Sequence, residues 1–306
     1  RSPANMYAYM NSETETKRFL MNFSAEYAFV PELVGKVTLG LDQSKSERHA
    51  EVGGLTRNVG NNVFGNGIAS LNDLNTQNKL MELTLTWDKV WENSKLNLLG
   101  GYSYQEFQRW GRNVNGRNFT NNENLSQMAS DLHASAAAIE AAINGSYQNY
   151  GLAPNGGFIN RLFPEPQTDA LPAVGLQNVG SVTGDQYDST DELQSYFARA
   201  NYTLFDKYLF TATIRADGSS KFGPDNQYGY FPSAAFAWKI NEESFIGDNV
   251  STLKARLSWG ITGNQDIGYG NFVRRERYAA PNIENNGNVN TPGLTCVAFA
   301  NPGLKW

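Results

Sequence analysis

Residues 195–264 read SYFARANYTLFDKYLFTATIRADGSSKFGPDNQYGYFPSAAFAWKINEESFIGDNVSTLKARLSWGITGN, and four runs within this stretch alternate between apolar and polar residues. A period of two predicts β-strands whose two faces meet different surroundings. One face carries the apolar residues of all four runs: Tyr196, Ala198, Ala200, Tyr202 and Leu204; Tyr208, Phe210, Ala212, Ile214 and Ala216; Pro232, Ala234, Phe236, Trp238 and Ile240; Leu253, Ala255, Leu257, Trp259 and Ile261. The opposite face is polar.

Strand length and aromatic positions distinguish a membrane barrel from a soluble sandwich, which shows the same alternation. A strand that crosses the hydrocarbon layer obliquely needs about 9–11 residues. Barrels of the outer membrane also carry aromatic residues where each strand meets the two interfaces. Aromatic residues lie near the strand ends here: Tyr196, Tyr202, Tyr208, Phe210, Phe231, Trp238 and Trp259. We therefore predict transmembrane β-strands around a polar lumen.

The composition agrees with this prediction and excludes other classes. The 306 residues are 40% hydrophobic with a mean hydropathy of -0.49, as expected when only every second strand residue contacts lipid. The net charge of -5 argues against a nucleic-acid binder. The single cysteine, Cys296, excludes an internal disulfide. Because the chain opens at Arg1 without a signal peptide, we interpret it as an internal piece of a longer protein.

Earlier in the chain the same alternation predicts four further strands. They are expected near residues 19–29, 37–41, 81–87 and 96–104, after a polar loop tail at 1–18. Two weaker strand patterns follow the main stretch, near 272–278 and 296–299. The fold class is therefore all-β, an antiparallel barrel segment of about 8–10 strands.

Two long segments between these strands are expected to be loops. They cover about residues 43–78 and 108–194, and they should face outside because barrels have short periplasmic turns and long extracellular loops. The second contains a short helix, ended by Gly145, whose apolar residues recur at helical spacing: Leu125, Met128, Leu132, Ala136, Ile139 and Ile143. We expect this apolar stripe to pack on the barrel mouth or on neighbouring loops.

Three segments of the chain carry a family resemblance. They are YLFTATIRADGSSKFGPDNQYGYFPSAAFAWKINEESF at 208–245, LKARLSWGITGNQDIG at 253–268 and NPGLKW at 301–306. Together they resemble the β-barrel region of SusC/RagA-type TonB-dependent outer-membrane transporters of Bacteroidota. The resemblance implies a barrel of about 22 strands filled by an N-terminal plug. Residues 1–306 would be a partial barrel domain, without the plug, the TonB box and the C-terminal strands.

The resemblance also implies a function and its partners. Such a transporter imports glycans, oligosaccharides or peptides through the cell outer membrane. It works with a SusD-like surface lipoprotein and takes energy from the TonB–ExbB–ExbD system through the plug. The protein would be surrounded by outer-membrane lipid, and neither a cofactor nor a nucleic acid is implied.

Two alternatives remain, an outer-membrane barrel enzyme and a soluble extracellular β-rich glycan-binding module. An enzyme needs a carboxylate and histidine constellation, yet the chain has only His49 and His133, both expected in outer loops. We predict no catalytic residue. No metal site is predicted either, because the acidic cluster lacks the spacing of a calcium loop: Asp185, Asp188, Asp191 and Glu192.

Solute binding is expected to involve aromatic and amide side chains of the outer loops. Residues of the right type in the second long loop are Trp110, Asn113, Tyr147, Tyr150 and Asn155. The lumen face carries five positive charges, which we expect to pair with acidic residues of neighbouring strands or of the plug: Arg199, Arg215, Lys239, Lys254 and Arg256.

Overall fold

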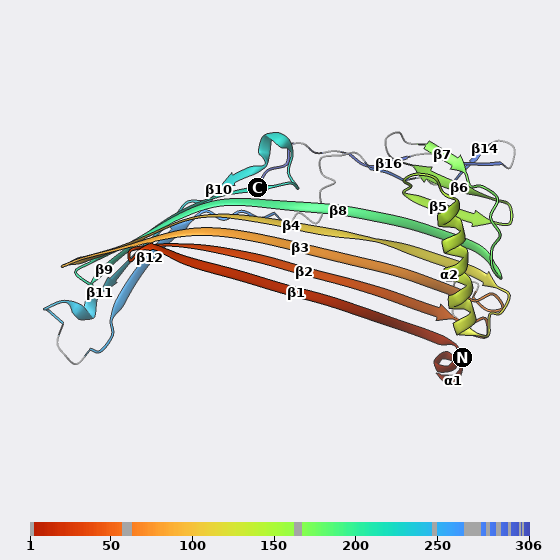
Figure 1. The fold of residues 1–306 in the computed structure, drawn as a ribbon, viewed down its shortest axis with the longest axis horizontal. Coiled ribbons are helices and arrows are strands. Elements are labelled where there is room, and N and C mark those ends of the chain that lie inside the picture. Colours follow the sequence, from red (N-terminus) through yellow and green to blue (C-terminus); the bar gives the residue numbers. More distant parts are fainter. Residues whose placement is uncertain are drawn as a thin grey trace.

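The computed structural model describes residues 3–56, 63–161, 167–246, 250–265, 277–279, 282–285, 289–292, 295–299, 301 and 303–306. Its main feature is one long, twisted antiparallel sheet, with short turns at one end and larger loops at the other (Figure 1). The five longest strands are neighbours in this sheet: β1 (Met10–Val30), β2 (Leu33–Val52), β3 (Ile68–Trp91), β4 (Ser94–Phe119) and β8 (Val179–Leu204).

The sheet continues from β8 through shorter strands. These are β9 (Tyr208–Ser219), β10 (Tyr228–Tyr230), β11 (Ser233–Lys239) and β12 (Lys254–Gly260). At the loop end a small hairpin extension is added to β8 by β5 (Asn149–Ala153), β6 (Gly156–Arg161) and β7 (Gln167–Ala170). Two separate pairs consist of β13 (Arg277–Ala279) with β16 (Thr295–Ala298), and of β14 (Asn282–Asn285) with β15 (Val289–Pro292).

Helical segments are few. They are α1 (Pro3–Ala8), α2 (Leu125–Ala142) and the 3-10 turns η1 (Pro224–Asn226) and η2 (Ile240–Glu242). None of the helices in the described ranges is long and apolar enough to cross a membrane. The predicted weak strands near the C-terminus correspond in part to β13 and β16, and residues 272–276 lie outside the described residues.

Strand register confirms the predicted apolar face. One row of directly paired residues crosses six strands: Ala25, Val37, Leu83, Tyr102, Tyr196 and Ala216. A second row lies nearer the short turns: Leu96, Tyr202, Phe210, Phe236 and Leu257. These rows form a continuous apolar belt. We call the side of the sheet that carries this belt the outer face, and the opposite side the lumen face.

The expected loops at 43–78 and 108–194 were too long. β2 and β3 leave only residues 53–67 between them, and β4 and β8 leave residues 120–178. The segment 1–18, expected to be a loop tail, contains α1 and the first half of β1. Strands of 20 to 26 residues are about twice as long as a membrane crossing needs. Their surplus halves carry mostly polar residues on both faces, with only isolated apolar residues such as Leu71 and Val114, so they lack the apolar alternation by which a strand is predicted.

The predicted helix is confirmed as α2. The side chain of Asn124 caps its N-terminus by accepting a hydrogen bond from the Gln127 backbone N–H at 3.1 Å, and Gly145 follows its end with a positive φ of 81°. Its apolar stripe is buried against residues of three strands: Leu71, Val114 and Val182. No bulge interrupts the register between these residues and the apolar belt. Because strand residues alternate between faces, α2 must pack on the outer face of the sheet.

Candidate functional site

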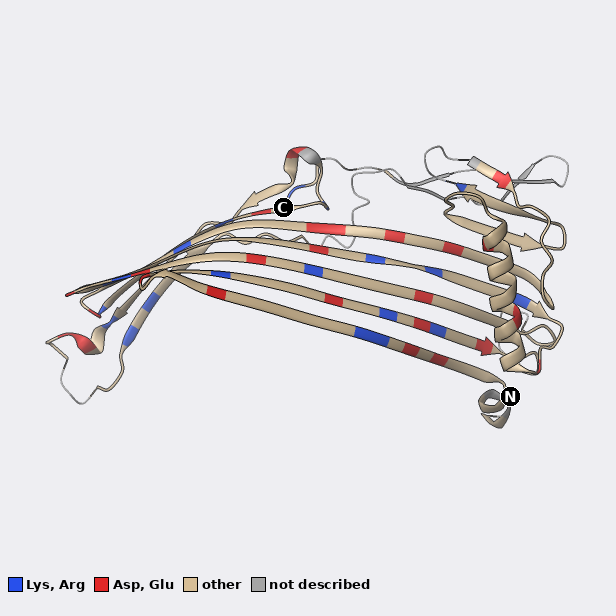
Figure 2. Cartoon of the chain, in the orientation of Figure 1, with Lys and Arg blue, Asp and Glu red and all other residues tan. Residues whose placement is uncertain are grey.

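Most charged side chains of the long strands lie in the half of the sheet nearer to the large loops. Charged residues are more numerous in the half of the long strands that lies nearer to α2 (Figure 2). The two faces of this half differ. The lumen face is open, whereas the outer face is partly covered by α2 and the residues that follow it.

On the lumen face, Asn113 and Tyr187 form a polar and aromatic surface together with two charged neighbours. Asn113 donates hydrogen bonds to Asp185 Oδ1 from its backbone N at 3.1 Å and from its side chain Nδ2 at 2.8 Å. The guanidinium of Arg109 lies 5.6 Å from the centre of the Tyr187 ring. A cation at this distance is attracted by the face of an aromatic ring.

Gly111 allows Tyr187 to lie across β4. The Tyr187 hydroxyl donates to the Asp73 carbonyl oxygen of β3 at 3.0 Å. A Cβ atom on Gly111 would lie 2.6 Å from this hydroxyl and 1.9 Å from the same carbonyl oxygen. Only a glycine fits between them, so the position of the Tyr187 ring depends on Gly111.

Farther along the lumen face, Arg215 is fixed by several partners. Its Nε donates to both carboxylate oxygens of Asp217 at 2.6 and 2.8 Å, and its Nη2 donates to Ser195 at 2.9 Å. Its guanidinium also lies 5.7 Å from the Phe197 ring centre. Arg215 was expected to pair with an acidic residue of a neighbouring strand, but its partner Asp217 belongs to the same strand.

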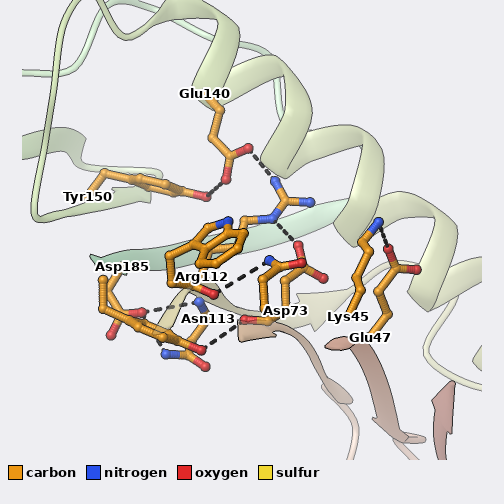
Figure 3. Close-up of polar contacts among 11 residues, drawn as sticks. Lys45, Glu47, Asp73, Arg112, Asn113, Glu140, Tyr150 and Asp185 are labelled. Atoms are coloured by element: carbon orange, nitrogen blue, oxygen red, sulfur yellow. Dashed lines mark hydrogen bonds and ion pairs between the residues drawn. The ribbon is translucent and has the colours of Figure 1, made fainter. Parts of the chain in front are cut away.

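On the outer face, a cavity of about 660 Å³ lies between the sheet and the segment after α2. Trp110 and Tyr147 contribute aromatic surface to its lining. Arg112 links the sheet to α2 at this cavity. It donates a hydrogen bond to Asp73 Oδ2 of β3 at 2.6 Å and forms an ion pair with Glu140 of α2 (Figure 3).

The hydrogen-bonding groups around this cavity have shifted pKa values. Burial, followed by the nearby Glu140 carboxylate, raises the pKa of Tyr147 to about 12. The same two causes raise the pKa of Tyr150, whose hydroxyl donates to Glu140 at 3.4 Å. Burial lowers the pKa of Arg112, but the ion pairs with Asp73 and Glu140 outweigh it, so the net pKa is raised. Arg112 therefore stays charged, and both tyrosines stay neutral at physiological pH.

The five predicted solute-binding residues lie in different places. Trp110 and Tyr147 line the outer-face cavity, whereas Asn113 lies on the lumen face. Tyr150 is 1% exposed and belongs to the core beneath α2. Asn155 is exposed at the tip of the hairpin between β5 and β6. Trp110 and Asn113 belong to β4 rather than to a loop.

Sequence reasoning missed Arg109, Arg112 and Tyr187, because their segments were expected to be loops. Continuing the alternation of β4 beyond Tyr104 would have placed Arg112 on the outer face and Arg109 on the lumen face. The same alternation divides the acidic cluster. Asp188 and Glu192 pair with Trp110 and Glu106 on the outer face, while Asp185 and Asp191 alternate to the lumen face.

The described residues contain no group of three or more His, Cys, Asp and Glu side chains that could hold a metal ion. His49 lies on β2 rather than in a loop, whereas His133 lies on α2, within the connection between β4 and β8.

Comparison with known proteins gives a consistent result. The family model described as "TonB dependent receptor-like, beta-barrel" matches residues 17–306. TonB-dependent receptor P3 of Formosa agariphila is 32% identical over 308 residues, which cover 99% of this chain and 26% of that protein. TonB-dependent receptor SusC of Bacteroides thetaiotaomicron is 58% identical over 84 residues, which are 27% of this chain and 8% of SusC.

A solved structure, that of the RagAB peptide transporter, has the same fold. It superposes with a TM-score of 0.69 over 97% of this chain and 27% of the matched chain, at 18% sequence identity. The chain thus spans about a quarter of the length of the relatives that it matches from end to end.

Proposed function

This chain belongs to the TonB-dependent receptor-like β-barrel family, and we propose that it forms part of the barrel wall of an outer-membrane importer for oligosaccharides. The observation that carries the proposal is the lumen surface around Tyr187. It combines an aromatic ring with amide, carboxylate and guanidinium groups.

This chemistry suits a sugar. Aromatic rings pack against the apolar faces of sugar rings, while amides and carboxylates exchange hydrogen bonds with hydroxyl groups. Asn113 is held in place by Asp185 and Tyr187 by Asp73, so both groups are ordered before a solute arrives. Ordering in advance reduces the entropy that binding costs.

We further propose that the complete importer lies in the cell outer membrane and works with a SusD-like surface lipoprotein. Energy would come from the TonB–ExbB–ExbD system through a plug outside this chain. The high identity to a segment of SusC supports this assignment. In such a protein the wall binds and guides a solute and has no catalytic role.

The test is uptake by cells that carry the full-length receptor and its neighbouring lipoprotein. We expect Tyr187→Ala and Asn113→Ala each to lower uptake of the oligosaccharide that supports growth of the parent strain by about fivefold, since a stacked ring and a positioned amide each contribute about 1 kcal/mol. Tyr187→Phe separates the two roles of Tyr187, because it keeps the ring and loses only the hydroxyl.

The matched control is Gln108→Ala, a change on the outer face of the same strand, where Gln108 donates to Asp188 at 3.1 Å. This variant should import at the parental rate. If Tyr187→Ala and Asn113→Ala, inserted at parental levels, also import at that rate, the lumen surface does not bind the solute. Uptake of labelled peptides in place of oligosaccharides would overturn the assignment of the solute.

A further inference from the structure

A second groove on the outer face adjoins the cavity beneath α2. Its volume is about 390 Å³, and it shares Asn75 and Trp110 with the first cavity. Its lining includes two ammonium groups, those of Lys17 and Lys45, and the amide side chains of Gln43 and Gln77. The Phe19 ring lies at the side of the groove that adjoins the apolar belt. The function proposed above makes no use of this groove, because the sheet separates it from the lumen.

The two lysines of the groove face each other across two strands. Lys17 pairs directly with Lys45 in the register of β1 and β2, and the next row places Glu15 opposite Glu47. Like charges that are directly opposite destabilise a sheet. The ion pairs run along the strands instead, from Lys17 to Glu15 at 2.9 Å and from Lys45 to Glu47 at 2.5 Å. The two ammonium groups therefore lie in the row nearer the belt, and the two carboxylates lie in the next row toward the loop end.

Both ammonium groups remain accessible to a ligand. The Lys17 side chain is 75% exposed and the Lys45 side chain 58% exposed. An ammonium group binds phosphate oxygens through short, charge-assisted hydrogen bonds.

The height of the groove above the belt is set by the register. Lys17 lies four residues beyond Met21 on β1, and Lys45 lies four residues beyond Leu41, which pairs with Met21 on β2. At about 3.3 Å per residue and a tilt of about 45°, four residues correspond to about 9 Å above the hydrocarbon layer. This is where the headgroups of the leaflet on the loop side lie.

We propose that this groove binds the phosphorylated sugar headgroup of a glycolipid in the outer leaflet. The lysines bind the phosphate, and Trp110 with Asn75 and Gln77 contacts the sugar. The acyl chains lie below, along Phe19 and the apolar belt. The proposal rests on the outer-membrane location given above and not on the imported solute.

The experiment uses the full-length receptor reconstituted in phosphatidylcholine nanodiscs. Diphosphorylated lipid A, dephosphorylated lipid A and phosphatidylglycerol serve as probes, and native mass spectrometry counts the lipids retained. We expect the parent to retain diphosphorylated lipid A at least about tenfold better than either other lipid, as two lysines near a membrane surface allow. Lys17→Gln with Lys45→Gln should lose this preference, and Trp110→Ala should weaken retention of both forms of lipid A.

The matched control changes the same charge elsewhere, with Lys36→Gln and Lys89→Gln. Lys89 shares the outer face but lies at the short-turn end, and Lys36 lies on the lumen face. The control should retain lipid A like the parent. Equal retention by the Lys17 and Lys45 double variant, or equal retention of phosphatidylglycerol by the parent, would overturn the proposal. A receptor absent from the outer-membrane fraction would instead refute the location. The Lys17 and Lys45 double variant should still import the oligosaccharide at the parental rate, because the sheet separates the groove from the lumen.

Discussion

Trp110 and Asn113 lie three residues apart on β4, yet the sheet separates their side chains. Trp110 pairs with Asp188 on the outer face and lines the cavity beneath α2, whereas Asn113 bonds Asp185 on the lumen face. Two residues that were predicted to contact the same solute therefore lie on opposite faces of the sheet. Only Asn113 shares the lumen face with Tyr187, on which the proposed function rests.

Substituting Leu85 by arginine should destabilise the wall. Leu85 lies in the apolar belt between Gly35 and Gly100 and is 47% exposed on the outer face. An arginine at mid-bilayer depth on the lipid face costs about 2–4 kcal/mol. The measurement is urea unfolding of the full-length receptor in lipid vesicles. Ile214→Arg should behave alike, and the neighbouring Thr84→Arg on the lumen face should cost much less. Equal costs at residues 84 and 85 would contradict the assigned faces.

Replacing Arg112 by methionine should loosen α2 from the wall. The change leaves the carboxylates of Asp73 and Glu140 near each other without their shared cation, at a cost of about 1–3 kcal/mol. Limited proteolysis of residues 120–178 should become faster while the rest of the barrel stays resistant. Adding Glu140→Gln removes one of the two charges and should restore part of the resistance. Unchanged cleavage in Arg112→Met would show that apolar packing alone holds the helix.

Glu51 makes the stability of the loop end depend on pH. It is 2% exposed, and burial raises its pKa although Asn11 donates a hydrogen bond to it at 3.0 Å. A raised pKa means that the folded state retains a proton that the unfolded state has lost. The stability contribution is therefore complete below the unfolded pKa and is lost as the pH rises through the folded pKa.

Glu51→Gln should remove this dependence and be more stable than the parent at pH 7. The free energy of unfolding, measured from pH 4 to pH 8, checks the expectation. A variant that is less stable than the parent at pH 7 would mean that the ionised carboxylate is itself stabilising.

At the short-turn end, Glu243 joins three side chains. It accepts hydrogen bonds from Tyr208 at 2.7 Å, Lys207 at 3.0 Å and Trp238 at 3.0 Å, which lower its pKa from 4.5 to about 2. Because the pKa of Glu243 is lower in the folded state than in the unfolded state, its carboxylate stabilises the fold at pH values above the unfolded pKa. This contribution is lost as the pH falls toward 2. Glu243→Gln should therefore be less stable than the parent at pH 7 and nearly equal to it at pH 2.

The neighbouring Glu242→Gln serves as the control, because the hydrogen bond that Glu242 accepts comes from its sequence neighbour Asn241 at 2.9 Å rather than from another strand of the described residues. Unfolding by urea at both pH values distinguishes the two changes. Equal stability of the Glu243 and Glu242 variants at pH 7 would show that the three contacts to Glu243 do not stabilise the turn.

Residue patterns alone predicted the apolar belt, its strand phase and helix α2. Leu83, Tyr102 and Tyr196 were each assigned to one face from alternation alone, and the register pairs them in one row. Alternation succeeds there because one face is apolar and the other polar. The helix was predictable because its stripe from Met128 to Ile139 is buried.

The full length of the strands and the contacts among polar residues became evident only from the folded chain. Beyond Tyr104 both faces of β4 are mostly polar, and the apolar residues Phe107, Trp110 and Val114 do not recur every second position. Hydropathy therefore carries no period of two there, and backbone hydrogen bonds to β3 and β8 maintain the strand to Phe119. The contacts of Arg112 with Glu140 and of Tyr187 with Asp73 join residues 28 and 114 positions apart. No local pattern encodes such pairs, because they depend on register and on which face α2 covers.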